Sequence, residues 1–210
     1  MQYDEKKIKA KDKLLEIFRK QGKHKQIDNR IPPGQHLTSG FPVLDLGVQP
    51  EMDMKTWKLE IIGLVEKPGE YSLEQLKKLG VQNYTKDFNC VTSWTKLDVK
   101  WTGIPMKKIL EFVKPRKEWK HLIQYGNDGY STNVVREDAE NDDCFLALEL
   151  DGKPIPREHG YIRLIIPRLY GWKTSKFLHK LEFTDKDKKG FWETRGYNNH
   201  GDAWKEERYS

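Results

Sequence analysis

The chain has 210 residues, of which 36% are hydrophobic, and a formal net charge of +6 at pH 7. This length suits one domain with a core large enough to fold without a structural metal, and two cysteines exclude a disulfide framework. No apolar run is long enough to span a membrane and the N-terminus lacks an apolar signal segment, so we expect a cytoplasmic protein with no membrane contact.

The positive charge is concentrated near the N-terminus. Residues 1–30 hold ten Lys and Arg against five Asp and Glu, whereas the remaining 180 residues hold 28 against 27. We therefore divide the chain into a basic helical arm, residues 1–30, and one domain, residues 31–210. A basic arm on a nearly neutral globule is a weak nucleic-acid signal. We expect no nucleic-acid partner, and the alternative of an arm that binds nucleic acid predicts affinity that falls steeply with salt.

Predicted elements alternate with loops in the first half of the chain. Apolar residues at helical spacing predict an amphipathic helix that packs on the domain and ends near Gly22. The apolar loop Gln35–Asp45 is expected to fold against the core or to cover a site. Strands are predicted at 57–61 and from about Tyr84 to Cys90, and a capping box predicts a short helix between them, from Ser72 to Gly80.

The second half is richer in strands. The segment Trp101–Pro105 is predicted to open a second helix, which Lys114 and Pro115 end. Strand-like runs follow at 121–125, 130–135, 144–150, 161–166 and 176–183. Six or seven strands, a few short helices and no regular βαβ alternation favour an α+β class with a mixed or largely antiparallel sheet. The aromatic segment 190–204 is expected to pack on the body of the fold, because disordered tails rarely carry so many aromatic side chains.

Cys90 is the first candidate for chemistry. A lone cysteine is most often a small buried hydrophobe, and Cys144, inside an apolar run, fits that interpretation. The neighbours of Cys90 are polar instead: Asp87, Asn89, Thr92 and Ser93. No local signature selects a histidine base for a cysteine hydrolase, and neither CxxC nor HExxH occurs for zinc. A single thiolate would suit a transition metal whose other ligands come from a cofactor.

Arg163 is the second candidate, because it lies inside the apolar run 161–166. A buried guanidinium needs an anion or another partner, and phosphate matches it through two parallel hydrogen bonds. The segment Gly171–Lys176 offers a glycine, two hydroxyls and two ammonium groups, which are donors that hold phosphate. The alternative is that this segment is a surface turn with solvated lysines.

Four separated motifs occur in one order: Asp87–Trp94, His159–Pro167, Tyr170–Lys176 and Gly190–Glu193. Together they resemble the sulfite oxidase family of molybdopterin-dependent oxidoreductases, above all its small single-domain prokaryotic members. The resemblance runs from about Pro33 to the C-terminus. It implies a sulfite oxidase-type molybdopterin-binding fold, with mixed β-sheets and short helices, for the oxidoreductase domain 31–210.

The resemblance also implies a set of site residues. Molybdenum, or alternatively tungsten, would be held by the dithiolene of one molybdopterin and by the thiolate of Cys90. Cys90 would be catalytic and metal-binding, and Tyr130 a second catalytic residue that faces the metal and bonds to a metal or substrate oxygen. The residues that would bind the cofactor are Ser39, Gly40, Phe41, Cys90, Asp128, His159, Arg163, Thr174, Ser175 and Lys176.

The implied reaction is a two-electron oxygen-atom transfer with a small-molecule oxo donor or acceptor. The family's sulfite oxidases bind their oxyanion with arginines at positions that match the neutral Thr38 and Thr95, so we do not expect sulfite as the substrate. The haem and dimerisation domains of those enzymes do not fit in this chain, so a separate electron-transfer partner and a monomer are expected. The alternative is a non-catalytic binding module, for which a thiolate at Cys90 would have no purpose.

Overall fold

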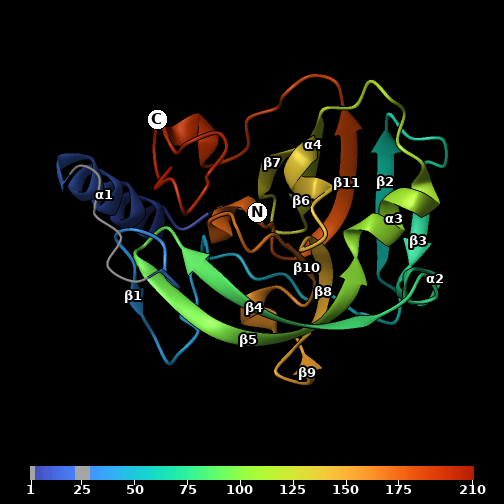
Figure 1. Ribbon diagram of the computed structural model, residues 1–210, viewed down its shortest axis with the longest axis horizontal. Helices are drawn as coiled ribbons and strands as arrows, with labels where there is room; N and C mark the ends of the chain where they lie inside the picture. Colours follow the sequence, from blue (N-terminus) through green and yellow to red (C-terminus); the bar gives the residue numbers. More distant parts are fainter. Residues whose placement is uncertain (1–2, 22–28) are drawn as a thin grey trace.

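Two β-sheets form the frame of the protein (Figure 1). The structure is a computed structural model, and it describes residues 3–21 and 29–210. The first sheet consists of β1 (His36–Leu37), β4 (Gln82–Cys90), β5 (Trp94–Pro105), β8 (Phe145–Leu150), β9 (Lys153–Pro154) and β10 (Arg163–Ile165). The second consists of β2 (Lys58–Gly63), β3 (Gly69–Ser72), β6 (His121–Gly126), β7 (Ser131–Val135) and β11 (Leu178–Thr184).

Helices are short except at the N-terminus. They are α1 (Glu5–Gln21), α2 (Leu73–Lys77), α3 (Met106–Val113) and α4 (Arg136–Ala139), with the 3₁₀ turns η1 (Arg157–His159), η2 (Gly171–Lys173) and η3 (Glu193–Arg195). Within the part of the chain that the structure describes, no helix is both long and apolar enough to cross a membrane.

Both sheets are mixed. The strand order in the first sheet is β1-β5-β8-β10, with β4 also paired to β5 and β9 to β8, and in the second it is β3-β2-β11-β6-β7. β1 runs parallel to β5 and β11 parallel to β2, while the other neighbouring strands are antiparallel. The predicted α+β class with mixed sheets and short helices is therefore confirmed.

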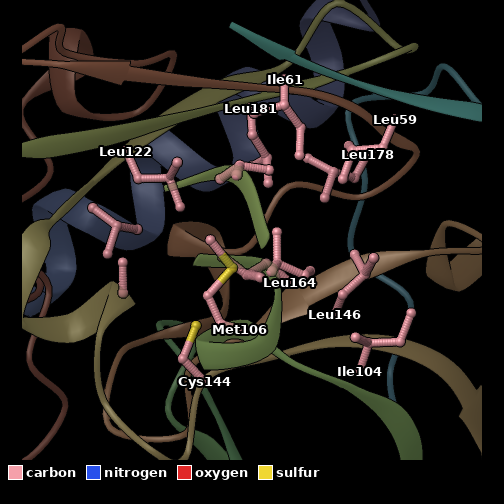
Figure 2. Close-up of a cluster of buried hydrophobic side chains, with 14 of the residues drawn as sticks. Leu59, Ile61, Ile104, Met106, Leu122, Cys144, Leu146, Leu164, Leu178 and Leu181 are labelled. Atoms are coloured by element: carbon pink, nitrogen blue, oxygen red, sulfur yellow. The ribbon is translucent and has the colours of Figure 1, made fainter. Parts of the chain in front are cut away.

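The main hydrophobic core fills the space between the two sheets (Figure 2). The second sheet contributes side chains such as Leu59 and Leu181, and the first contributes Leu146 and Leu164, all fully buried. Cys144 packs among them and is 1% exposed, as its apolar neighbours predicted. Burial of this apolar surface is the main force that holds one sheet on the other.

Most predicted elements are confirmed, including the capping box of α2. The hydroxyl of Ser72 accepts from the Gln75 backbone N–H at 3.3 Å, and the Gln75 side chain accepts from the Ser72 N–H at 2.8 Å. The helix expected to open at Trp101–Pro105 is wrong in its first turn, because these residues end β5 and pair with β8. The helix α3 begins one residue later, at Met106. Gly103 allows β5 to lie close to β8, because a Cβ there would lie 2.6 Å from the Leu146 carbonyl oxygen.

The segments at the two ends of the chain pack together on one side of the first sheet. The aromatic residues Trp192 and Tyr197 are buried in a cluster with Tyr170 and Trp172, which confirms the expected packing of the C-terminal segment. A fully buried ion pair between Lys173 and Glu193, with an Nζ–Oε1 distance of 2.6 Å, anchors that segment.

Helix α1 lies against the same side. Its first turn is capped by Asp4, whose carboxylate accepts from the Lys6 N–H at 2.9 Å, and whose own N–H donates to the Leu46 carbonyl at 2.8 Å. The ammonium of Lys7 pairs with the carboxylate of Asp45 at 2.5 Å. The predicted packing of this helix on the domain is thus confirmed, while its predicted end at Gly22 lies outside the described residues.

Candidate functional site

Cys90 is the last residue of β4, where the chain turns back into β5. Cys90 pairs with Trp94 across this hairpin, and the Ser93 N–H donates to the Cys90 carbonyl at 3.1 Å. Ser93 takes a φ of 70°, a conformation uncommon for residues other than glycine and often found beside functional groups. The turn holds the Cys90 sulfur 3.2 Å from the Thr92 hydroxyl and on the wall of a cavity.

This turn is braced by two residues that are remote in sequence. The Gln35 side-chain N–H₂ group donates to the carbonyls of Cys90 and Trp94, both at 3.0 Å. The guanidinium of Arg208 donates to the Gln35 side-chain oxygen at 3.0 Å and to the Val91 carbonyl at 2.7 Å. Buried polar groups that form several hydrogen bonds in this way rigidify their surroundings, so the turn that carries the sulfur is constrained.

The cavity beside Cys90 has a volume of about 110 Å³. Aromatic rings form most of its wall: Phe41, Phe88, Trp94, Tyr130, Trp172, Trp192 and Tyr197. Of the described residues, its cationic lining side chains are Lys11, Arg163 and Lys176. An apolar hollow with a few convergent polar groups is the usual form of a small-molecule site.

Arg163 reaches this cavity from β10. Its Nη2 donates to the hydroxyl and the carbonyl of Thr174 at 2.6 and 3.2 Å, and its side chain lies over the ring of Phe88. Burial lowers the pKa of the guanidinium to about 10, so the group is still cationic at neutral pH. Its Nε is buried and has no hydrogen-bond partner among the described residues, which leaves a donor available for a bound molecule.

Lys176 and His159 lie next to this guanidinium. The ammonium of Lys176 donates to the Glu158 carbonyl at 2.7 Å, and the His159 ring stacks on Phe41 with centroids 4.7 Å apart. Burial, reinforced by the charge of Arg163, lowers the pKa of Lys176 to about 7 and that of His159 to about 4. Both shifts are the response of cationic groups that are desolvated and crowded together, and an anion between them would reverse it.

Gly160 makes this crowding possible. It follows η1 with a φ of 98°, and a Cβ at this position would lie 2.6 Å from the Lys176 Cβ and 2.8 Å from the Phe177 nitrogen. Only a glycine lets the two segments approach this closely while adopting the left-handed backbone conformation. The predicted neighbours His159 and Lys176 are therefore brought together by a backbone feature.

Asp128 and Tyr130 also line the cavity, and the charge of Asp128 acts on Lys176. The Asp128 carboxylate accepts from the Tyr130 N–H at 3.1 Å, and burial raises its pKa to about 6. The Tyr130 hydroxyl donates to the Trp172 carbonyl at 2.6 Å. In this arrangement the Tyr130 proton is already used, and the hydroxyl oxygen retains its capacity to accept a hydrogen bond.

Burial favours the neutral thiol of Cys90, and a bound cation would favour the thiolate. Burial raises its pKa, opposed by the Thr92 hydrogen bond and by the charges of Lys11 and Arg208. No group of three His, Cys, Asp or Glu side chains in the described residues could hold a metal by itself. A metal bound to Cys90 would therefore take most of its ligands from a cofactor, and its charge would ionise the thiol.

Three of the predicted cofactor-binding residues lie outside the cavity wall. Ser39 and Gly40 are exposed, and the Ser39 carbonyl accepts from Lys96 at 2.8 Å. Ser175 is fully buried, and its hydroxyl donates to the Lys176 carbonyl at 3.1 Å, so it supports the turn from behind. Phe41, Cys90, Asp128, Tyr130, His159, Arg163, Thr174 and Lys176 do line the cavity.

Several other lining residues were not predicted. Lys11 comes from a helix in which lysines are frequent, so nothing in the pattern distinguishes it. The rings of Trp172 and Trp192 lie within recognised motifs, but their side-chain directions depend on the tertiary packing of the C-terminal segment. A loop signal was present for Asp45, because the segment Gln35–Asp45 was too apolar to be a free linker, whereas Leu46 lies just beyond that segment.

Comparisons with known proteins found a matching family model and several similar proteins. Residues 46–192 match the model of the oxidoreductase molybdopterin binding domain. The chain is 36% identical over 193 residues to the uncharacterized oxidoreductase YuiH of Bacillus subtilis (strain 168), covering 90% of this chain and 98% of YuiH. It is 27% identical over 165 residues to the protein-methionine-sulfoxide reductase catalytic subunit MsrP of Campylobacter jejuni subsp. jejuni serotype O:2, covering 70% of this chain but 55% of MsrP.

The fold is also found in a solved structure. The crystal structure of the sulfane dehydrogenase SoxCD from Paracoccus pantotrophus superposes with a TM-score of 0.60 at 24% identity, over 67% of this chain and 41% of that one. The chain thus spans nearly all of YuiH but only about half of the larger proteins that it matches.

Proposed function

The chain belongs to the family of oxidoreductase molybdopterin-binding domains, and on this basis we propose that it is a molybdenum enzyme that transfers one oxygen atom and two electrons to or from a small molecule. The observation that carries the proposal is the placement of the Cys90 sulfur and the Arg163 guanidinium on the wall of one cavity. The first suits a soft metal and the second suits a phosphate.

The residues present fit a phosphorylated, metal-bearing cofactor. Neither Arg163 nor Lys176 forms an ion pair with a described carboxylate, although both are largely buried. The charges of Asp45 and Asp128 act on Lys176 only from beyond ion-pair distance. Two desolvated cations without an ion-paired carboxylate are costly unless an anion joins them. The unpartnered Nε of Arg163 is a further donor for the same anion.

Each residue then has a defined task. Cys90 would bind the molybdenum as a thiolate, and Arg163, Lys176 and Thr174 would hold the phosphate of the pterin, with His159 beside them. The cofactor, when bound, supplies the exchange of two electrons and an oxygen atom. Tungsten in place of molybdenum would require no different protein ligand.

The remaining side chains control access and protons. The aromatic rings that line the cavity exclude water, which strengthens every polar interaction inside it. The carboxyl group of Asp128, whose pKa is about 6, can hold or release a proton near neutral pH. The Tyr130 hydroxyl, bonded to the Trp172 carbonyl, offers only its oxygen as an acceptor to a substrate.

We propose that sulfite is not the substrate. Thr38 and Thr95 occupy the positions at which the family's sulfite oxidases are expected to carry arginines. Thr95 is fully buried, and its hydroxyl donates to the Asn89 side-chain oxygen at 2.7 Å, so it presents no group to the cavity. Electrons would pass to or from a separate protein, a proposal in line with the name of MsrP as a catalytic subunit.

Metal and cofactor analysis tests the proposal directly. Protein produced in a host that makes the pterin should carry molybdenum or tungsten close to one atom per chain, and should yield a fluorescent pterin after oxidation. The control is the same protein from a host unable to make the pterin, which should carry neither. A purified wild-type chain without metal and without pterin would refute the proposed function.

A further inference from the structure

Helix α1 places one more cation in the candidate cavity, on the side of Cys90. Lys11 is a lining residue, and its ammonium lies 5.3 Å from the centroid of the Trp192 ring. The charges of Lys11 and Cys90 are close enough to influence each other's pKa. The helix that seemed from the sequence to be an accessory arm therefore contributes to the wall around the sulfur.

The hydrogen bonds of Lys11 leave part of its ammonium free. Its Nζ donates to the Asp45 carbonyl at 2.8 Å, and the face of Trp192 provides a cation–π contact. An ammonium has three N–H donors, and one of them is used in a hydrogen bond to a described residue. The described residues place no carboxylate within ion-pair distance of this nitrogen.

The nearby carboxylate of Asp45 forms no ion pair with Lys11, because other groups occupy it, and its charge only opposes the lowering of the Lys11 pKa by burial. It accepts from the Lys7 ammonium and the Gln49 side chain, both at 2.5 Å, and from the Gly47 N–H at 2.8 Å. These bonds lower the pKa of Asp45 to about 2. Lys7 thus pairs with the Asp45 carboxylate, whereas Lys11 donates to the main-chain carbonyl of Asp45.

The other two lining cations come from different elements. Arg163 is fixed by Thr174, and Lys176 is fixed by the Glu158 carbonyl beside His159. Their task in the proposed function is the cofactor phosphate. Lys11 is near enough to Lys176 to lower the pKa of that ammonium, but it belongs to α1 and contacts Asp45 and Trp192 instead of the segments that hold Arg163 and Lys176. We therefore assign it a separate task.

We propose that Lys11 is a substrate-binding residue, and that the substrate is a small oxo donor or acceptor that carries an anionic group separate from its reacting atom, such as a carboxylate or a sulfonate. This inference rests on the proposed function. The ammonium binds the anionic group of the substrate and so orients its reacting atom toward the Cys90 side of the cavity. Specificity for an anionic substrate then depends on a helix that lies outside the matched domain, residues 46–192.

The first test is equilibrium binding of an anion to the loaded protein. Sulfate is the probe, titrated by calorimetry against wild type, Lys11→Met, Lys11→Arg and the control Lys13→Met, which removes an exposed lysine of the same helix. Lys11→Met should weaken sulfate binding roughly tenfold to a hundredfold, as expected for loss of one charged hydrogen bond. Lys11→Arg should retain most of it, and Lys13→Met all of it. Equal binding by wild type and Lys11→Met, or an equal loss in Lys13→Met, would overturn the proposal.

The second test separates substrate binding from cofactor binding. Methylsulfinylacetate and its neutral amide form a matched pair, and their thioethers serve for the opposite direction. Lys11→Met should raise KM for the anionic member roughly tenfold or more and leave KM for the amide unchanged, with molybdenum content equal to wild type. A loss of molybdenum in Lys11→Met would assign Lys11 to the cofactor and refute this inference. An absence of molybdenum in the wild type would instead refute the proposed function.

Discussion

Arg163 of β10 donates two hydrogen bonds to Thr174 at the wall of the cavity. The Nη2 atom of Arg163 donates to the hydroxyl of Thr174 at 2.6 Å and to its carbonyl at 3.2 Å, and the same hydroxyl donates to the Gly171 carbonyl at 2.7 Å. One side of the guanidinium is therefore fixed by the chain, which leaves Nε without a partner among the described residues. A group oriented in this way is prepared for a bidentate anion.

Replacement of Arg163 by Lys should lower cofactor retention. An ammonium keeps the charge but cannot both bond to Thr174 and present two parallel donors, so we expect at least tenfold weaker retention of the pterin. The measurement is molybdenum and pterin per chain after extended dialysis. Thr174→Ser, which keeps the hydroxyl, is the control and should retain the cofactor. Full retention by Arg163→Lys would contradict a phosphate grip at this position.

The two cysteines should respond differently to the same substitution. Cys90→Ser should leave a folded protein with no turnover, because a serine hydroxyl is a poor ligand for a soft metal. Cys144→Ser places a hydroxyl in the main core and should cost about 1–3 kcal/mol of stability, with the activity of each folded molecule unchanged. Activity assays and chemical unfolding of both variants check this pair. Equal loss of activity would remove the special status of Cys90.

Lys176 should make the stability of the cofactor-free protein depend on pH. Its pKa is about 7 in the folded state against 10.5 as the ordinary value, so between these limits the unfolded chain binds more protons than the folded chain. The free energy of unfolding should therefore rise as the pH increases from about 7 toward 10.5. Lys176→Met should flatten this rise, whereas Lys153→Met, at an exposed position, should not. Denaturant unfolding across that range measures both slopes, and parallel slopes for wild type and Lys176→Met would show that the ammonium is solvated.

The buried pair of Lys173 and Glu193 should be necessary for the cavity wall. Lys173→Met leaves the Glu193 carboxylate buried with the Thr132 hydroxyl as its remaining partner, and we expect a loss of about 3–5 kcal/mol. The double variant Lys173→Met, Glu193→Leu should recover part of that loss, because it leaves no unpaired charge. Urea unfolding of the single and double variants gives the coupling between the two sites. Additive effects would mean that the pair does not act as a unit.

The sequence predicted the strands of this fold better than their boundaries. The strand that ends at Cys90 was predicted because a β-rich run meets a polar turn there. The end of β5 was mistaken for a helix start because proline is typical of the first turn of a helix, and only the pairing with β8 shows that Trp101–Pro105 is a strand. The two-residue strands β1 and β9 carry no periodic signal and form because longer neighbours offer them an edge.

The candidate site was predictable where one residue was anomalous in its own segment. Arg163 inside an apolar strand and Cys90 among polar neighbours both met this condition, and both line the cavity. Lys11 did not, because it is one of ten basic residues in the first 30. Its neighbours Trp192 and Asp45 come from distant segments, and their approach to α1 is a property of tertiary packing alone.

The bonds of Arg208 connect distant parts of the chain at one point. This residue braces Gln35 and the turn that follows Cys90, and Trp192 and Tyr197 complete the same wall. The pocket is therefore complete only after segments far apart in the sequence have met. Because such long-range contacts form slowly, we expect the pocket to be completed late in folding.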